Sequence, residues 1–141
     1  MGCGGSNTVA LCDTGEIYVW GWGEQGQLGL GSTTMTRYPT LLEDLLDKGS
    51  TPYLLELVGW LTGRPGVTDL LICGSHSAAL TRTGELYCWG SSTAGQVGHD
   101  TSTAIYDTPK LVEHFRTDTV EDIAVSGGIR AGDRSATLRR L

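Results

Sequence analysis

The chain has 141 residues, of which 39% are hydrophobic, and its 16 acidic and 10 basic side chains give a net charge of −6. This length suits one domain, and no run approaches the roughly 20 apolar residues of a membrane helix. The acidic balance argues against direct nucleic-acid binding, which usually shows a basic stripe. The one basic cluster is most simply a solvated strand face: Arg130, Arg134, Arg139 and Arg140.

The N-terminal residues 1–5 have neither a basic segment nor an apolar core, so they do not resemble a secretory signal. Four cysteines occur in the chain, none in a C-x-x-C pair, and no histidine lies at a zinc spacing from them: Cys3, Cys12, Cys73 and Cys88. We therefore expect no metal, no cofactor, no membrane partner and reduced thiols. Reduced thiols predict a nuclear or cytoplasmic location.

The first distinctive motif is G-W-G-E-Q-G, from Gly21 to Gly26, directly after the strand-like run I-Y-V-W. It has the G-x-G-x-x-G spacing of a dinucleotide-binding loop, which must open a helix. The following residues, 27–39, are too rich in Gly and Thr to propagate a helix. We therefore expect a structural loop that holds no phosphate.

The chain repeats itself. Residues 4–31 align without a gap on residues 73–100, and 13 of the 28 aligned pairs are identical. The shared unit is Y-x-W-G, a spacer, and then G-Q-[LV]-G, and the sequence gives these residues a structural role. In the first copy they are Gly15, Tyr18, Trp20, Gly21, Gly26, Gln27 and Gly29; in the second they are Gly84, Tyr87, Trp89, Gly90, Gly95, Gln96 and Gly98.

Two copies span about residues 4–72 and 73–130, and a partial third spans 131–141. In the second copy we expect strands at 77–82, 85–89, 109–115 and 120–125, with Gly84 in the left-handed position of a short hairpin. Short strands with glycine turns predict an all-β fold. Four strands per repeat predict a partial β-propeller of about two blades plus one strand of a third.

An insertion at 46–68 has no counterpart in the second copy. Thr51 is a candidate N-cap, Pro52 a first helical residue and Gly63 a stop, which together predict a short helix. Insertions in repeat proteins map to loops that often bind partners. The candidate contacts are Leu54, Leu57, Val58, Trp60 and Leu61. Alternatively, this helix covers its own blade.

Catalytic patterns are missing from the sequence, and we expect no enzyme. His76 lies in G-S-H-S, but its counterparts are Asn7 and Arg134. Such a position suits a polar side chain that ties the start of a strand by hydrogen bonds, not a general base.

The pattern G-S-H-S-A-A-L-T-R-T-G-E-L-Y-C-W-G, followed by G-Q-V-G-H-D and P-K-L-V, resembles the regulator of chromosome condensation repeat. The resemblance covers residues 4–45 and 69–138, and it implies a fragment of one seven-bladed propeller domain. Within the family, the stretches T-R-T-G-E-L-Y-C-W-G and L-V-E-H-F are most similar to the C-terminal part of a chromatin-associated member.

The resemblance implies two functions. One is a protein-interaction scaffold whose partner is a histone-associated protein or a small GTPase, and an acidic surface fits such a basic partner. The other is guanine-nucleotide exchange on a Ran-type GTPase by a longer parent protein, since two blades offer too little of the surface that exchange uses. We favour the scaffold.

Overall fold

The computed structural model describes residues 2–3, 6–12, 15–46, 67–81, 83–99 and 103–123. The first sheet contains β1 (Gly2–Cys3), β2 (Asn7–Leu11), β3 (Ile17–Gly21) and β4 (Thr36–Leu41). The second contains β5 (Val67–Cys73), β6 (His76–Thr81), β7 (Leu86–Ser91) and β8 (Ile105–Leu111). The 3-10 helices η1 (Glu43–Leu45) and η2 (Glu113–Phe115) follow β4 and β8.

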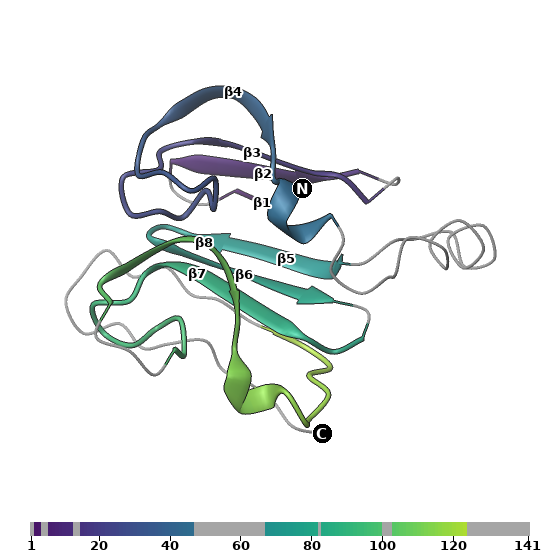
Figure 1. The fold of residues 1–141 in the computed structure, drawn as a ribbon. Coiled ribbons are helices and arrows are strands. Elements are labelled where there is room, and N and C mark those ends of the chain that lie inside the picture. Colours follow the sequence, from purple (N-terminus) through teal and green to yellow (C-terminus); the bar gives the residue numbers. More distant parts are fainter. Residues whose placement is uncertain are drawn as a thin grey trace.

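Each sheet is an antiparallel meander in which the strands are neighbours in chain order. The two sheets stack face to face, so that the first lies over the second (Figure 1). Two stacked four-stranded meanders are the expected blades of a propeller, and the all-β prediction is confirmed.

The hairpin turns follow the repeat. Gly84 has φ 83° and donates its N–H to the Thr81 carbonyl at 3.0 Å. Gly15 has φ 94° and makes the same bond to Cys12 at 3.0 Å. Because side chains rarely adopt positive φ, glycine is the residue that closes this turn, and the prediction for Gly84 is confirmed.

The predicted strand at 109–115 has the wrong bounds. The strand is β8, Ile105–Leu111, and Pro109 lies inside it rather than at its start. β8 is an edge strand, and its register against β7 shifts between the pairs Cys88↔Lys110 and Gly90↔Tyr106. An edge bulge tolerates the missing N–H of proline. The end of the predicted strand is η2, closed by the bond from Arg116 N to the Glu113 carbonyl at 3.1 Å.

The predicted strand at 120–125 is also wrong as far as the structure describes it, because residues 120–123 are not in a strand. The remaining strand of the second sheet is β5, which lies at the end of the first sequence copy. The sheets are thus offset from the sequence period by one strand. Residues 47–66 of the insertion and 131–141 of the third copy lie outside the described residues, so the helix and the third-blade strand expected there stay predictions.

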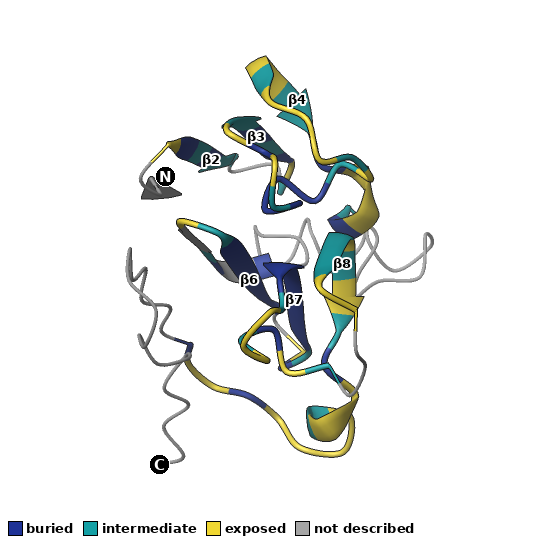
Figure 2. Ribbon diagram, turned by 90° about the vertical axis from the view of Figure 1, so that its left-hand side faces the viewer, coloured by how far each residue is buried: buried dark blue, intermediate teal, exposed yellow. Residues whose placement is uncertain are grey.

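The two faces of each blade differ. Paired residues lie on one face of a sheet, so Val9, Ile17 and Val19 share a face of the first sheet, and Ala79, Tyr87 and Trp89 share a face of the second. These two faces form one buried cluster between the sheets. Burial is deepest in β6 and β7, whereas the residues of β4 and β8 are intermediate or exposed (Figure 2).

The opposite faces are less alike. Ala78, Leu80, Leu86 and Cys88 on the far face of the second sheet form a second cluster, together with residues that include Val120. The far face of the first sheet carries the pair Thr8↔Trp20 and the pair Ala10↔Tyr18, all of them only partly buried. We call this set, Thr8, Ala10, Tyr18 and Trp20, the outer face of the first blade.

Candidate functional site

The two G-Q-[LV]-G loops have the same backbone conformation. The four glycines of the motif, Gly26, Gly29, Gly95 and Gly98, have φ values from 70° to 74°. In the first loop the Gln27 side-chain oxygen accepts the Gln25 N–H at 2.9 Å. In the second, Gln96 accepts the Ala94 N–H at the same distance. Each glutamine thus braces its own loop from within.

Gln27 also joins the two blades. Its side chain is 1% exposed, and its Nε2 donates to the Gly74 carbonyl at 3.1 Å. Its own carbonyl accepts Ser77 Oγ at 2.8 Å and Trp89 Nε1 at 3.0 Å. One residue of the first blade therefore satisfies three polar groups of the second. The bonds to Ser77 and Trp89 are buried, where an unpaired group is costly.

Apolar packing surrounds this polar junction. Trp89 is 0% exposed, Leu28 of the loop is also fully buried, and both belong to the inter-blade cluster. A Cβ on Gly29 would lie 2.7 Å from Trp89 Nε1, so the backbone of the loop rests directly on the indole. The repeat motif thus serves as a blade-to-blade clamp, which we call the Gln27 junction: Gln27, Leu28, Gly29, Gly74, Ser77 and Trp89.

The second loop has no such clamp among the described residues. The Nε2 of Gln96 donates only to Ser91 Oγ, within its own blade, at 3.4 Å. A Cβ on Gly95 would meet nothing within 4 Å. The same motif therefore lies open on the second blade.

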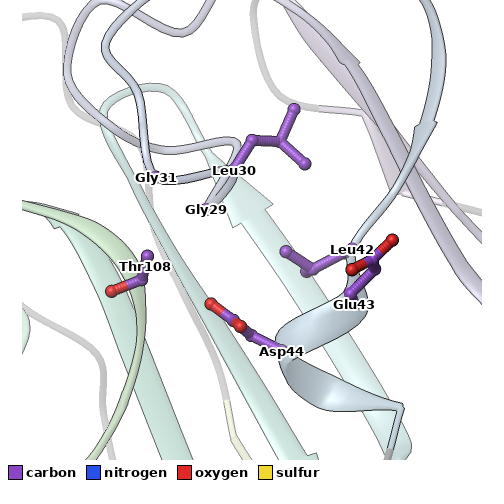
Figure 3. Close-up of a pocket in the computed structure, with 7 residues that line it drawn as sticks. All are labelled: Gly29, Leu30, Gly31, Leu42, Glu43, Asp44 and Thr108. Atoms are coloured by element: carbon purple, nitrogen blue, oxygen red, sulfur yellow. The ribbon is translucent and has the colours of Figure 1, made fainter.

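A cleft of about 320 Å³ opens beside the Gln27 junction. It is lined by residues 29–31 of the first loop, by Leu42, Glu43 and Asp44 at the start of η1, and by Thr108 of β8. Asp44 points from η1 into the space between the loop and Thr108 (Figure 3). The cleft is therefore an inter-blade feature with an acidic side.

Family models match two segments of the chain. Residues 14–52 and residues 74–96 each match a model described as the regulator of chromosome condensation (RCC1) repeat. The chain carries RCC1 repeats. The family expected from the sequence is thereby confirmed.

Two curated relatives cover most of the chain. RCC1 domain-containing protein 1 of Mus musculus is 35% identical over 147 residues, which covers 91% of this chain and 39% of the relative. E3 ubiquitin-protein ligase HERC2 of Homo sapiens is 36% identical over 125 residues, which covers 89% of this chain and 2% of that protein. The chain thus spans about two fifths of the first relative and a small part of the second.

The solved structure of human WBSCR16 has a TM-score of 0.65 and 29% identity, over 89% of this chain and 27% of that chain. The chain is a partial all-β propeller, as its repeats predict.

The apparent nucleotide motif of the first RCC1 repeat opens no helix. Residues 22–35, all of them described, form turns and bends between β3 and β4. Gly26 and Gly29 instead face the second blade, since a Cβ at Gly26 would lie 2.9 Å from Ile105 Cγ2. These glycines lie where the blades meet, and absence of phosphate binding stays a prediction.

The repeat position shared by Asn7 and His76 differs from expectation. Both side chains are buried, at 3% and 8% exposure. Neither polar atom of the Asn7 amide, nor His76 Nε2, has a hydrogen-bond partner within the described part of the chain. The predicted hydrogen bonds from these atoms are therefore not found there. Burial lowers the pKa of His76, which favours the neutral ring.

Cys12, Cys88 and His99 are further titratable groups that are buried or partly buried. Cys12 and Cys88 are free thiols, and burial raises the pKa of Cys88 to about 12, which leaves it protonated. His99 donates from Nε2 to the Cys88 carbonyl at 2.9 Å, and its ring packs on Tyr106 with centroids 4.7 Å apart. Burial is the main cause that lowers the pKa of His99, and Lys110 lowers it further.

In the described ranges, no group of three or more His, Cys, Asp or Glu side chains could hold a metal ion. In the same ranges, no helix is long and apolar enough to cross a membrane.

Sequence reasoning missed three exposed apolar side chains, Trp22, Met35 and Tyr38, which are 44%, 49% and 78% exposed. Gly21 pairs with Thr36, and a Cβ on Gly23 would touch the Thr34 carbonyl, so Trp22 and Met35 lie opposite each other at the end of β3. The sequence did offer one clue to Trp22: in the alignment of the two repeats, Trp22 lies opposite Ser91, so the repeat itself does not require a tryptophan there. An apolar residue that the repeat does not require is a candidate for contact. The contacts predicted on the insertion lie outside the described residues.

Proposed function

We propose that the chain is a protein-interaction scaffold and not an enzyme. RCC1-repeat relatives support a protein-interaction or exchange-related role in general. The observation that favours a scaffold is where the motif residues lie. Gln27, Trp89, Gly26 and Gly29 are used in packing the blades, which leaves the loop ends and the rim for a partner.

The exposed pair Trp22 and Met35 is the contact that we propose from the described residues. Binding hot spots are enriched in tryptophan, and methionine adapts to irregular surfaces. The amphipathic segment of the insertion, with Leu57 and Trp60, is a second proposed contact that rests on sequence alone. A basic protein is the favoured partner because the chain has a net charge of −6. We propose a histone-associated protein or a small GTPase as this partner, and the nucleus or cytoplasm as the location of the scaffold.

The scaffold function is tested by capturing the partner from extracts and then measuring its binding to the chain with purified components. The 141-residue chain is cross-linked in nuclear and cytosolic extracts, the partner is identified, and binding is then measured with the purified partner. We expect the variant W22S/M35S to bind at least about tenfold more weakly, as for a hot-spot pair. Trp22→Ser installs the residue of the second repeat, so an unchanged melting temperature is expected and serves as the control.

The exchange alternative is tested in parallel by the release of fluorescent GDP from candidate GTPases. We expect the same release rate with and without the chain. A rate that rises with the concentration of the chain would support exchange and would contradict a scaffold that performs no exchange.

A further inference from the structure

The cleft beside the Gln27 junction combines an apolar border with free negative charge. Leu30 and Leu42 border it, Thr108 offers a hydroxyl, and Glu43 and Asp44 stand exposed at one side (Figure 3). A volume of about 320 Å³ is at the small end of ligand pockets, which span roughly 300 to 1,000 Å³. The cleft therefore has room for one side chain rather than for a cofactor.

In the second repeat, the glutamate that corresponds to Glu43 is paired with an arginine of its own blade. Glu113 corresponds to Glu43, and it forms a salt bridge with Arg116 at 3.4 Å. In the first repeat, Leu46 replaces Arg116, and Asp44 replaces His114. Across the described residues, neither Glu43 nor Asp44 takes part in a salt bridge. Among the described residues, the first repeat therefore has one more carboxylate at this position than the second, and no counterpart of Arg116.

The two carboxylates suit a cationic side chain better than a metal ion. Calcium takes about six to eight oxygen ligands, and magnesium demands a near-ideal octahedron. Two carboxylates and one hydroxyl fall short of either. A guanidinium offers five donors in a planar fork that matches carboxylates, and its apolar stem covers leucine side chains.

We propose that this cleft binds an arginine side chain of a protein partner, with the guanidinium on Asp44 and Glu43 and the stem along Leu30 and Leu42. The proposal rests on the proposed scaffold function and adds a contact of defined chemistry to it. Both carboxylates are exposed, so the contact is weak alone and sensitive to salt. This contact therefore contributes to the specificity for a partner more than to the affinity.

The experiment measures fluorescence anisotropy of a labelled peptide that has one arginine among glycines and alanines, titrated with the 141-residue chain. Its twin contains citrulline, which keeps the shape and removes the charge. We expect the arginine peptide to bind about fivefold more tightly than its twin, and Asp44→Asn to remove most of this difference. Glu113→Gln is the matched control on η2, and we expect it to leave binding within about twofold of the original.

A second variant, Thr108→Val, keeps the shape of the side chain and removes the hydroxyl, and we expect it to retain the preference for arginine. Equal binding of the two peptides would overturn the proposal, as would equal effects of Asp44→Asn and Glu113→Gln. Displacement of the peptide by millimolar calcium in an Asp44-dependent way would also overturn it, in favour of a metal site. These outcomes leave the capture experiment untouched, so the scaffold can stand if the arginine site fails.

Discussion

The first and second G-Q-[LV]-G loops have the same sequence pattern and the same backbone conformation, yet they make different contacts. Gln27 is buried and bonded to the second blade, whereas Gln96 is partly exposed and, among the described residues, bonded only within its own blade. A Cβ on Gly29 would clash with Trp89, whereas a Cβ on Gly98 would lie 3.4 Å from Val112 Cγ1. The motif thus specifies a loop shape, and a neighbouring blade turns that shape into a clamp.

Replacing Trp89 and Trp20 should show the largest difference in unfolding free energy between the Gln27 junction and the outer face of the first blade. Trp89 is fully buried and donates to the Gln27 carbonyl, so Trp89→Ala should cost about 3–5 kcal/mol of unfolding free energy. Trp20 lies on the partly exposed outer face, so Trp20→Ala should cost about 1 kcal/mol. Urea unfolding of both variants measures the difference. Equal losses would mean that the outer face is as well packed as the junction.

Substitutions of the loop glycines Gly29 and Gly98 should give the next largest losses of stability. Both have φ near 70°, where a side chain costs about 1–2 kcal/mol, so Gly98→Ala should lose that amount. Gly29→Ala adds a clash with the Trp89 indole, so we expect a loss of about 2–4 kcal/mol. Chemical denaturation reports both values. A Gly98→Ala variant that is the less stable of the two would show that the second loop is also clamped.

A pH series should give a smaller effect that is centred on the second blade. Burial lowers the pKa values of His76 and His99, so the unfolded chain binds protons more readily. Stability should be unaffected above about pH 6.5 and should fall as the pH drops below it toward the folded pKa values. The variant H76N/H99L carries the residues of the first repeat. Its stability should fall less between pH 7.5 and 5.5, and an unchanged fall would reject the assignment.

Nucleotides should have no effect. ATP, GTP or NAD at millimolar concentration should leave the melting temperature unchanged, because the G-x-G-x-x-G stretch is part of a blade junction. A ligand at about 100 times its Kd would add about 2.7 kcal/mol of stability. A reproducible rise of several degrees, lost in a Gly26→Ala variant, would restore the phosphate-binding interpretation.

The sequence predicted the features that depend on local chemistry. A repeated Tyr, Trp and Gly pattern indicated blades, and the glycine at Gly84 indicated a hairpin turn that the structure has. It did not predict which repeat supplies which strand of a sheet, because β5 pairs with β6 through contacts that the period does not encode. Pro109 was expected to begin a strand, and its place in an edge bulge depends on the register with β7.

The candidate site was predictable only in part. Gln27 and Trp89 stood out as repeated residues, but their hydrogen bond joins positions 62 residues apart. Ser77 and the Gly74 carbonyl carried no signal of their own. The cleft could not be foreseen either, because its lining comes from one loop, η1 and the edge strand β8.

Paired unfolding of Gln27→Ala and Gln96→Ala tests the central claim most directly. Each variant loses the same bond within its loop, so the difference between them reports the clamp between the blades. Gln27→Ala also leaves the Gly74 carbonyl without its donor, and we expect a loss of about 2 kcal/mol, against less than about 1 kcal/mol for Gln96→Ala. Equal losses from the two variants would contradict the assignment of the first loop as the blade-to-blade clamp.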